Sequence, residues 1–263
     1  MAVRSLYSAA TGMLAQQLNV EVISNNIANL TTTGFKRSRA EFADLLYQEF
    51  RRVGSPSTND NTIVPAGVQI GLGVKPVAVY RMHEQGNLLK TDNQLDVAVS
   101  GRGYFNITLP NGETAYTRNG AFQISPDGEV VTVDGFLVQG LAAIPEDTVQ
   151  ITVNQQGQML AARDGVIEPE DLGQYEMTTF INDAGLQAIG DNLLLETPAS
   201  GDPVNGFAGD VGFGQIVQGF LETSNVNAVT EITSLITAQR TYEMNSQVVQ
   251  ASDEMLRTVS NIR

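Results

Sequence analysis

The chain lacks several residue types and patterns on which common protein functions depend. It has no cysteine and a single histidine, His83. Without cysteine there can be no disulfide, thiolate metal site or thiol nucleophile. One histidine also leaves too few ligands for a multi-histidine zinc site. No serine of the chain lies in a nucleophile-elbow sequence, so we expect His83 to be a hydrogen-bonded structural residue and not a catalytic one.

Long hydrophobic runs are also missing. The longest apolar runs are a few residues, whereas a membrane-spanning helix needs about 20. The first twenty residues are interrupted by polar and small residues, namely Ser8, Thr11, Gly12, Gln16 and Gln17. The sequence therefore predicts no membrane insertion and no cleavable signal peptide of the usual design. If the protein leaves the cytosol, we expect it to use a route that does not read such a signal.

Basic residues are scarce and unevenly distributed. The chain has 15 Lys and Arg against 29 Asp and Glu, a net charge of -14, and residues 119–263 hold only 4 of the basic residues but 20 of the acidic ones. Nucleic-acid binding needs clustered basic residues, so this balance argues against it. Five basic residues fall in one short stretch, at Lys36, Arg37, Arg39, Arg51 and Arg52. A solvated basic face is the first interpretation, and contact with an acidic neighbouring subunit is the alternative.

Motifs for cofactors and hydrolysis are absent or weak. No Walker A sequence occurs, and pairs such as Gly101 and Gly103 lack the third glycine of a dinucleotide-binding loop, so we expect no cofactor. Glu168, Glu170 and Asp171 could supply a glycosidase pair. Because they lie in the acid-rich part of the chain, we expect them on the surface. A carbohydrate-active enzyme with a β domain stays a distant alternative.

The ends of the chain, in contrast, carry helical heptads. Apolar residues recur every seven positions, as Leu6, Met13, Val20 and Ile27 near the start and Leu235, Tyr242, Val249 and Leu256 near the end. Small or polar residues fill the second heptad position, as Ala10, Gln17 and Ser24, and as Ala238, Asn245, Ser252 and Val259. This period keeps two helices face to face, so we expect the ends to meet in a coiled-coil-like assembly domain. Such a half-polar seam is weak alone and depends on further packing; ordinary amphipathic helices docked on one core are the alternative.

Between the ends the period changes to that of strands. Val68, Ile70, Leu72 and Val74 alternate with small or polar residues, and turn sequences such as Asn111-Gly112 separate later apolar runs. Before this region, Ser38 and Glu41 resemble a capping box, which predicts a short second helix. We therefore predict an α+β fold with long terminal helices and an inserted antiparallel β-rich domain. The predicted segments are a helix in 1–34, a short helix and extended arm in 35–66, the β domain in 67–222, and a helix in 223–263.

Several sequence strings together resemble the rod and hook proteins of the bacterial flagellum. These strings are Asn25-Asn-Ile-Ala-Asn29 with Thr33-Gly-Phe-Lys36, Ser100-Gly-Arg-Gly-Tyr-Phe105, Tyr116-Thr-Arg-Asn-Gly-Ala-Phe122, Gln218-Gly-Phe-Leu-Glu-Thr-Ser-Asn-Val-Asn227, and the final-helix strings Ala238-Gln-Arg-Thr-Tyr-Glu243 and Asp253-Glu-Met-Leu256. The resemblance covers almost the whole chain. Its most specific part is the combination of Asn25, Asn26, Ile27 and Asn29 with Gly34 and Phe35. Length and layout are most similar to the distal rod members.

The resemblance implies a structural role and a set of partners. In this family the terminal helices line the inner tube of a hollow helical assembly, and the subunits are exported through the flagellum's own apparatus. It implies a helical homopolymer in the basal body, across the periplasm, in contact with neighbouring rod and hook proteins, the surrounding envelope rings and the export apparatus. The heptad residues would carry the assembly interface. It implies no enzymatic activity, metal or cofactor.

The segment from Tyr47 to Pro65 is expected to decide which member of the family this is. It is similar to the segment associated with a straight, stiff rod, where it would pack against adjacent subunits and prevent sliding. An idle surface loop is the alternative for the same residues. A proximal rod protein or a short hook protein is the nearest alternative for the whole chain, and a surface adhesin with a helical stalk is another.

Overall fold

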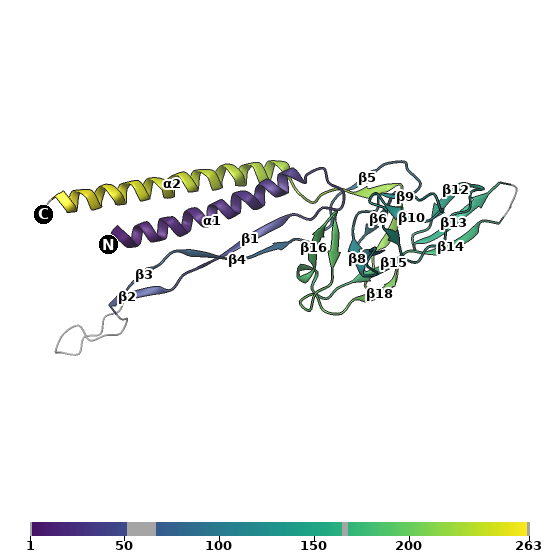
Figure 1. Ribbon diagram of the computed structural model, residues 1–263, viewed down its shortest axis with the longest axis horizontal. Coiled ribbons are helices and arrows are strands. Elements are labelled where there is room, and N and C mark those ends of the chain that lie inside the picture. The colour runs from purple at the N-terminus through teal and green to yellow at the C-terminus, as the bar shows by residue number, and fades with distance from the viewer. Residues whose placement is uncertain (1, 52–66, 165–167, 262–263) are drawn as a thin grey trace. The chain divides into compact units, whose positions relative to one another are not determined.

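The computed structural model describes residues 2–51, 67–164 and 168–261, and the chain divides into two compact units. The helical unit comprises Met1–Ala28, Ser38–Tyr80 and Asn227–Arg263, and the β unit comprises Asn29–Arg37 and Arg81–Val226. The chain begins and ends with a helix, and the elements between them in the sequence are mostly antiparallel strands (Figure 1). This confirms the predicted α+β class.

The helical unit contains the long helices α1 (Ala2–Ala28) and α2 (Ala228–Asn261). Asn227 caps α2, because its side-chain Oδ1 accepts hydrogen bonds from the backbone N–H groups of Val229 and Thr230 at 3.1 and 3.2 Å. Glu231 in the first turn complements the positive end of the helix dipole. The helix that the sequence predicts within 223–263 thus begins at Ala228.

Four strands complete the helical unit, and they replace the predicted second helix. Strand β1 (Ser38–Asp44) pairs with β4 (Val74–Arg81), and β2 (Tyr47–Arg51) pairs antiparallel with β3 (Val68–Gly71). The capping-box interpretation was wrong because Asn26 on α1 binds Ser38 in extended form. Asn26 Oδ1 accepts from Ser38 N at 2.8 Å, and its Nδ2 donates to Ser38 O at 2.9 Å. Strand pairing then outweighs the short helical pattern.

This strand pairing also moves a predicted domain boundary. The sequence placed residues 67–222 in the central domain, whereas β3 and nearly all of β4 belong to the helical unit. The reason is that their partners, β1 and β2, follow α1 directly in the chain. We refer to β1, β2, β3 and β4 together as the ribbon.

The β unit is built from short strands connected by tight turns. Its elements are β5 (Leu88–Lys90), β6 (Val97–Ser100), β7 (Tyr104–Thr108), β8 (Thr114–Thr117), β9 (Phe122–Ile124), β10 (Val130–Thr132), β11 (Leu137–Val138), β12 (Thr148–Val153), β13 (Gln158–Arg163), β14 (Glu170–Gln174), β15 (Glu176–Thr179), the 3-10 helix η1 (Asp183–Gly185), β16 (Gln187–Gly190), β17 (Leu193–Leu195), β18 (Val204–Phe207), β19 (Gln215–Gln218) and β20 (Phe220–Glu222). The turn at Asn111-Gly112 joins β7 to β8, as predicted.

The main sheet of the β unit runs in the order β16-β17-β8-β7-β11-β10-β9, with β15 pairing both β7 and β18. Strands β12, β13 and β14 form a separate sheet, and β6 pairs with β19 and β5 with β20. The core centres on Phe105, Phe122 and Tyr175, whose ring centroids lie 5.3 to 5.9 Å apart. Over the parts of the chain that the structure describes, no helix is long and apolar enough to cross a membrane.

Candidate assembly interface and buried charge cluster

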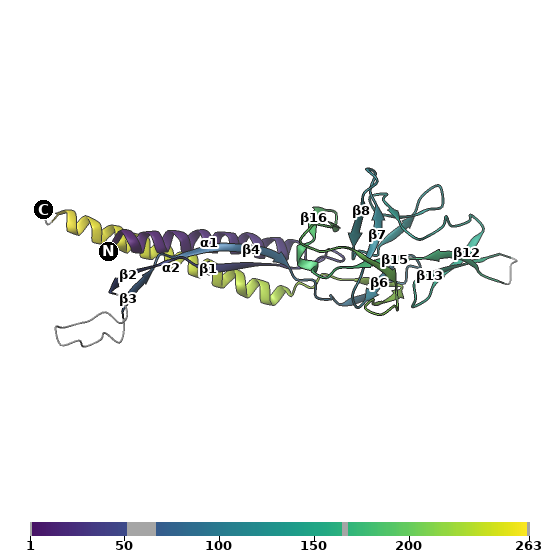
Figure 2. The same cartoon turned by 90° about the horizontal axis from the view of Figure 1, so that it is seen from below.

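Helices α1 and α2 lie side by side and run antiparallel (Figure 1 and Figure 2). Their register is fixed by contacts at heptad steps. Ser5 Oγ lies 2.9 Å from Ser252 Oγ, and Asn26 Nδ2 donates to Glu231 Oε2 at 3.2 Å. Between them, a Cβ placed on Gly12 would lie 2.9 Å from the side chain of Asn245. Each step of seven residues along α1 is thus matched by seven residues back along α2.

We call these residues the intrachain seam, and they are small or polar. Asn26, Glu231 and Ser252 are 2%, 6% and 1% exposed. Ala238, at the remaining heptad step of α2, is 2% exposed. Buried polar groups in a helix pair specify register and partner at a cost in stability, because any shift would leave them without hydrogen bonds. The seam therefore fixes how the two helices align through small and polar side chains.

The residues predicted to carry assembly flank this seam. Leu6, Met13, Val20, Ile27, Leu235, Val249 and Leu256 are partly buried, and Tyr242 is 44% exposed. On α2 the second predicted heptad position, Ala238, Asn245 and Ser252, does face α1. On α1 the corresponding Gln17 and Ser24 are exposed. Helix geometry of about 100° per residue places the predicted face of α1 roughly a third of a turn away from the intrachain seam.

The helical unit also leaves many large apolar side chains exposed. They are Tyr7, Leu14, Leu46, Tyr47, Phe50, Val68, Ile70, Val77, Val79, Val229, Ile232, Ile236, Tyr242, Met244, Val248 and Met255. Single exposed apolar residues are ordinary on a monomer, but a concentration on one unit marks a surface that binds another protein. These side chains, and not the seam, are the unused apolar surface of the helical unit.

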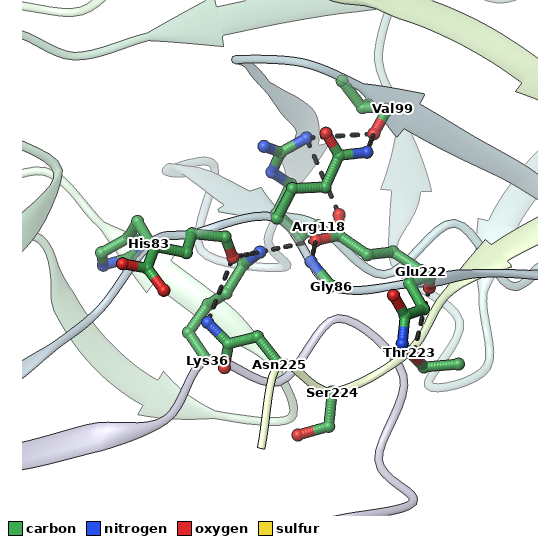
Figure 3. Close-up of polar contacts among 12 residues, drawn as sticks. Lys36, His83, Gly86, Val99, Arg118, Glu222, Thr223, Ser224 and Asn225 are labelled. Atoms are coloured by element: carbon green, nitrogen blue, oxygen red, sulfur yellow. Dashed lines mark hydrogen bonds and ion pairs between the residues drawn. The ribbon is translucent and has the colours of Figure 1, made fainter. Parts of the chain in front are cut away.

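The β unit contains a buried charge cluster formed by Lys36, Arg118 and Glu222 (Figure 3). Lys36 Nζ lies 2.6 Å from Glu222 Oε1, and the two side chains are 4% and 0% exposed. Arg118 Nη1 lies 3.8 Å from Glu222 Oε2. Backbone groups complete the site, because Lys36 Nζ donates to Glu84 O at 2.7 Å and Gly86 N donates to Glu222 Oε1 at 2.8 Å.

Local backbone structure brings the two ends of the β unit together at this cluster. Gly34 adopts φ +69, and its N–H donates to Glu222 O at 2.8 Å. A Cβ on Gly34 would lie 2.8 Å from Asn119 N, so both its conformation and its surroundings favour glycine. Asn225 accepts a hydrogen bond from Arg37 N at 2.7 Å and donates to Met82 O at 2.9 Å. The segment that follows α1 and the segment that precedes α2 are thereby joined.

The cluster perturbs the ionisation of its neighbours. Burial lowers the pKa of Lys36, and the carboxylate of Glu222 opposes that shift. Burial, followed by the positive charges of Lys36, Arg81 and Arg118, lowers the pKa of His83 to about 4. His83 is therefore neutral at pH 7, and its Nδ1 shares a hydrogen bond of 2.7 Å with the Tyr104 hydroxyl. This confirms the interpretation of His83 as a hydrogen-bonded structural residue.

The family-motif residues occupy structural positions. Asn26 binds both Ser38 and Glu231, and Asn29 accepts from Thr32 through its backbone and side chain at 3.3 and 3.2 Å. Phe35 is 7% exposed. Asn25 is exposed and Ile27 is partly buried. The motif thus includes Asn26, the residue that joins α1 to the ribbon and to α2.

Sequence reasoning missed Lys36, Arg118 and Glu222 as a site, although all three lie in the strings that carry the family resemblance. A usable signal was present for two of them, because Lys36 follows Phe35 and Glu222 follows Leu221. The seam residues Ser5 and Gly12 had no such signal. The acidic residues Glu168, Glu170 and Asp171 are exposed, as expected.

The chain thus has a polar helix pair with exposed apolar side chains around it, and a β unit whose two ends are joined by an ion pair. These features define a structural protein. Family models agree along the chain: "Flagella basal body rod protein" matches residues 6–36, "Flagellar hook protein FlgE/F/G D1 domain" residues 98–161, and "Flagellar basal body rod FlgEFG protein C-terminal" residues 217–262. The chain belongs to the flagellar basal-body rod protein family.

Relatives match over their full lengths. The chain is 54% identical to the flagellar basal-body rod protein FlgG of Caulobacter vibrioides over 99% of both chains. It is 52% identical to FlgG of Agrobacterium fabrum over 98% of both chains. It is 46% identical to FlgG of Borreliella burgdorferi over 99% of this chain and 98% of that protein. A solved hook protein, Helicobacter pylori FlgE2, matches 71% of this chain and 43% of its own at 15% identity and a TM-score of 0.26, which is too low to support an argument.

Proposed function

We propose that this chain is the structural subunit of the distal rod of the flagellar basal body. Copies polymerise into a hollow helical shaft that transmits torque and serves as an export channel. One observation on the helical unit supports this mechanism. The residues by which α1 and α2 contact each other are small or polar, whereas large apolar side chains such as Leu14 and Val229 are 65% and 75% exposed. The full-length similarity to FlgG proteins supports the distal position.

In this mechanism, copies join through a heterologous interface that does not close into a ring, which gives a helical tube. The intrachain seam aligns α1 with α2, and the exposed apolar side chains then pack between copies in a coiled-coil-like arrangement. Burial of apolar surface supplies cohesion at roughly 25 cal/mol per Å² before entropy is subtracted. Leu6, Met13, Val20, Ile27, Leu235, Tyr242, Val249 and Leu256 would contribute to these contacts.

The proposed partners are other copies of this chain, the neighbouring rod and hook proteins, the surrounding envelope rings and the export apparatus. The protein would cross the periplasm within the basal body after export by a route other than a cleaved signal peptide. We propose no enzymatic activity. Among the described residues, His83 is bonded to Tyr104 and no group of three or more His, Cys, Asp or Glu could hold a metal ion.

The segment from Tyr47 to Pro65 would stiffen the rod by packing against adjacent subunits. Tyr47 begins strand β2 and is 56% exposed, whereas Pro65 lies outside the described residues, as do residues 52–66 as a whole. Deleting residues 47–65 should give tubes that bend. Straight tubes from that deletion would reject the stiffening role and favour an idle surface loop.

The proposed function is tested by complementing a strain that lacks this chain. Val249→Asp places a charge beside the intrachain seam and should prevent rod assembly while the purified protein keeps its β structure by circular dichroism. Val211→Asp is the matched control, because Val211 is fully exposed in the β unit. Electron micrographs of purified basal bodies should show rods with the control and none with Val249→Asp. Rods of normal length from both variants would contradict the proposal.

A further inference from the structure

The chain contains three Asn-Gly pairs, at Asn111-Gly112, Asn119-Gly120 and Asn205-Gly206. An asparagine that precedes glycine can lose its side-chain amide without an enzyme, because glycine has no side chain to obstruct attack by its backbone nitrogen on the asparagine Cγ. Such an intramolecular attack is fast only where the fold holds the two atoms close together and leaves them free to react. The surroundings of the three pairs differ in this respect.

Asn111-Gly112 lies in the exposed turn between β7 and β8. Asn111 Oδ1 accepts a hydrogen bond from Glu113 N at 3.0 Å, and Asn111 Nδ2 donates to Glu113 Oε2 at 2.7 Å. The side-chain amide is thus folded back along the backbone, which brings its Cγ toward Gly112 N. The Glu113 N–H also polarises the amide carbonyl, and this favours attack on Cγ.

The attacking nitrogen of this pair can be released without disturbing the fold. Gly112 N donates to Leu109 O at 2.9 Å, which is one hydrogen bond in an exposed turn, and such bonds open readily in a folded protein. A Cβ added to Gly112 would have no atom within 4 Å, so the turn has room to move. Asn111, Gly112 and Glu113 are all exposed, and water therefore reaches the site.

Asn119-Gly120 has the same local hydrogen bond in a closed environment. Asn119 Oδ1 accepts from Ala121 N at 3.2 Å, but it also accepts from Thr33 Oγ1 at 2.9 Å. Gly120 is buried, and a Cβ added to it would overlap Val97 O. The peptide plane between Asn119 and Gly120 therefore has no room to rotate. This pair has the chemistry of Asn111-Gly112 without its freedom of movement, and we expect it to react slowly.

Asn205-Gly206 lies within strand β18. Its two residues pair with Thr178 and Met177 of β15, and Thr178 Oγ1 donates to Asn205 Oδ1 at 2.6 Å. A Cβ added to Gly206 would lie 2.6 Å from the ring of Phe213. Attack on the Asn205 side chain would require this part of the sheet to open. We therefore expect slow reaction here as well, although Asn205 is exposed.

We propose that Asn111 is a site of spontaneous modification in the folded protein, by cyclisation with Gly112 and loss of ammonia. Gly112 N gives its proton to hydroxide and attacks Asn111 Cγ. The new C–N bond closes a five-membered imide, the Cγ–Nδ2 bond breaks, and Nδ2 takes a proton from water and leaves as ammonia. Water then opens the imide at Cγ, which gives aspartate, or at the backbone carbonyl carbon, which gives isoaspartate. No electrons are exchanged, and hydroxide and water are the only co-reactants.

The product differs from the native turn in charge and in hydrogen bonding. The Nδ2 donor that binds Glu113 Oε2 is lost, and a carboxylate takes its place. Two negative groups then face each other across the turn, which destabilises it. The chain, whose net charge is -14, gains one negative charge. Because the reaction needs no enzyme, the modified fraction increases with the time since the chain folded. The inference does not depend on the proposed function.

Peptide mass spectrometry of the full purified chain tests the inference. The chain is incubated in mildly alkaline buffer, digested, and the peptides that contain Asn111, Asn119 and Asn205 are followed over time. The Asn111 peptide should convert to aspartate and isoaspartate forms roughly tenfold faster than the other two, or more. In concentrated urea the three rates should become similar, because the fold no longer protects Asn119 and Asn205.

The isoaspartate form and one variant identify the mechanism. Direct hydrolysis of the amide gives aspartate alone, whereas opening of the imide gives both products. Asn111→Gln keeps an amide in the turn but cannot close the five-membered ring, so position 111 should remain unmodified in that variant. Similar rates at the three sites in the folded chain, an intact Asn111, or aspartate without isoaspartate would each overturn the inference. Rates that stay different in urea would overturn it too, because the sequence and not the fold would then set the selectivity.

Discussion

Lys36 and Glu222 form an ion pair of 2.6 Å in which both side chains are almost completely buried. One residue lies just after α1 in the sequence and the other just before α2. The pair therefore joins the two places where the chain enters and leaves the β unit. Removing two charges from water is costly, so the stability of the pair depends on the hydrogen bonds that Lys36 donates to Glu84 O and that Glu222 accepts from Gly86 N.

Breaking this pair should destabilise the β unit. Glu222→Gln leaves the Lys36 ammonium buried without a counter-charge, and we expect the free energy of unfolding to fall by about 3–5 kcal/mol. Urea unfolding of the full purified chain, followed by circular dichroism, measures the change.

The matched control removes both charges. Lys36→Met with Glu222→Leu removes both charges of the pair and leaves Arg118 with its backbone acceptors Val99 O and Gly101 O. It should recover part of the loss, because apolar replacements of a buried pair are often neutral or stabilising. A double variant as unstable as Glu222→Gln would show that the hydrogen bonds to Gly86 and Glu84, and not the charges, hold the site together.

Gly34 should tolerate alanine poorly. Its φ of +69 is unfavourable for other residues, and the added Cβ would meet Asn119 N at 2.8 Å. Gly112→Ala is the comparison, because Gly112 has a φ of +85 with nothing within 4 Å of the added atom. Both variants should lose roughly 1–2 kcal/mol from the backbone term, and Gly34→Ala should lose more. Equal unfolding midpoints would contradict the crowding at Asn119.

Stability should depend on His83 in the acidic range. The folded-state pKa of about 4 lies below the ordinary value of 6.5, so the folded state binds this proton less readily than the unfolded state. The contribution is complete above pH 6.5 and is lost as the pH falls toward 4. The difference in unfolding free energy between the native chain and His83→Gln should therefore shrink over this range. A difference that stays constant from pH 7 to 4 would contradict the assignment.

Gly12 should control the approach of α1 to α2. Gly12→Leu places a large side chain against Asn245, whereas Gly12→Ala requires only a small movement of that flexible side chain. In a chain that carries Ser5→Cys and Ser252→Cys, whose Oγ atoms lie 2.9 Å apart in the native chain, the yield of the disulfide between these positions should fall strongly with leucine and little with alanine. Asn245→Gly should restore it in the leucine variant. An unchanged yield with Gly12→Leu would show that the seam is not closely packed at this step.

The sequence was sufficient for features that depend on local pattern. Heptads predicted the terminal helices, and turns such as Asn111-Gly112 marked hairpins. It was insufficient for residues 38–51, where Asn26 and the partner strands β3 and β4 impose extended structure on a helical pattern. The choice between helix and strand there depends on residues distant in sequence.

What the amino-acid sequence determined by itself was the α+β class, the meeting of the two ends and the family motifs, because periodicity and turn residues act through neighbouring positions. The tertiary structure alone decided which helix faces meet and which charges are buried together. Several faces of one helix can carry heptads, so only the hydrogen bonds of Ser5 and Asn26 selected the intrachain seam. Likewise, Lys36 and Glu222 are 186 residues apart, and only the folded β unit brings them into contact.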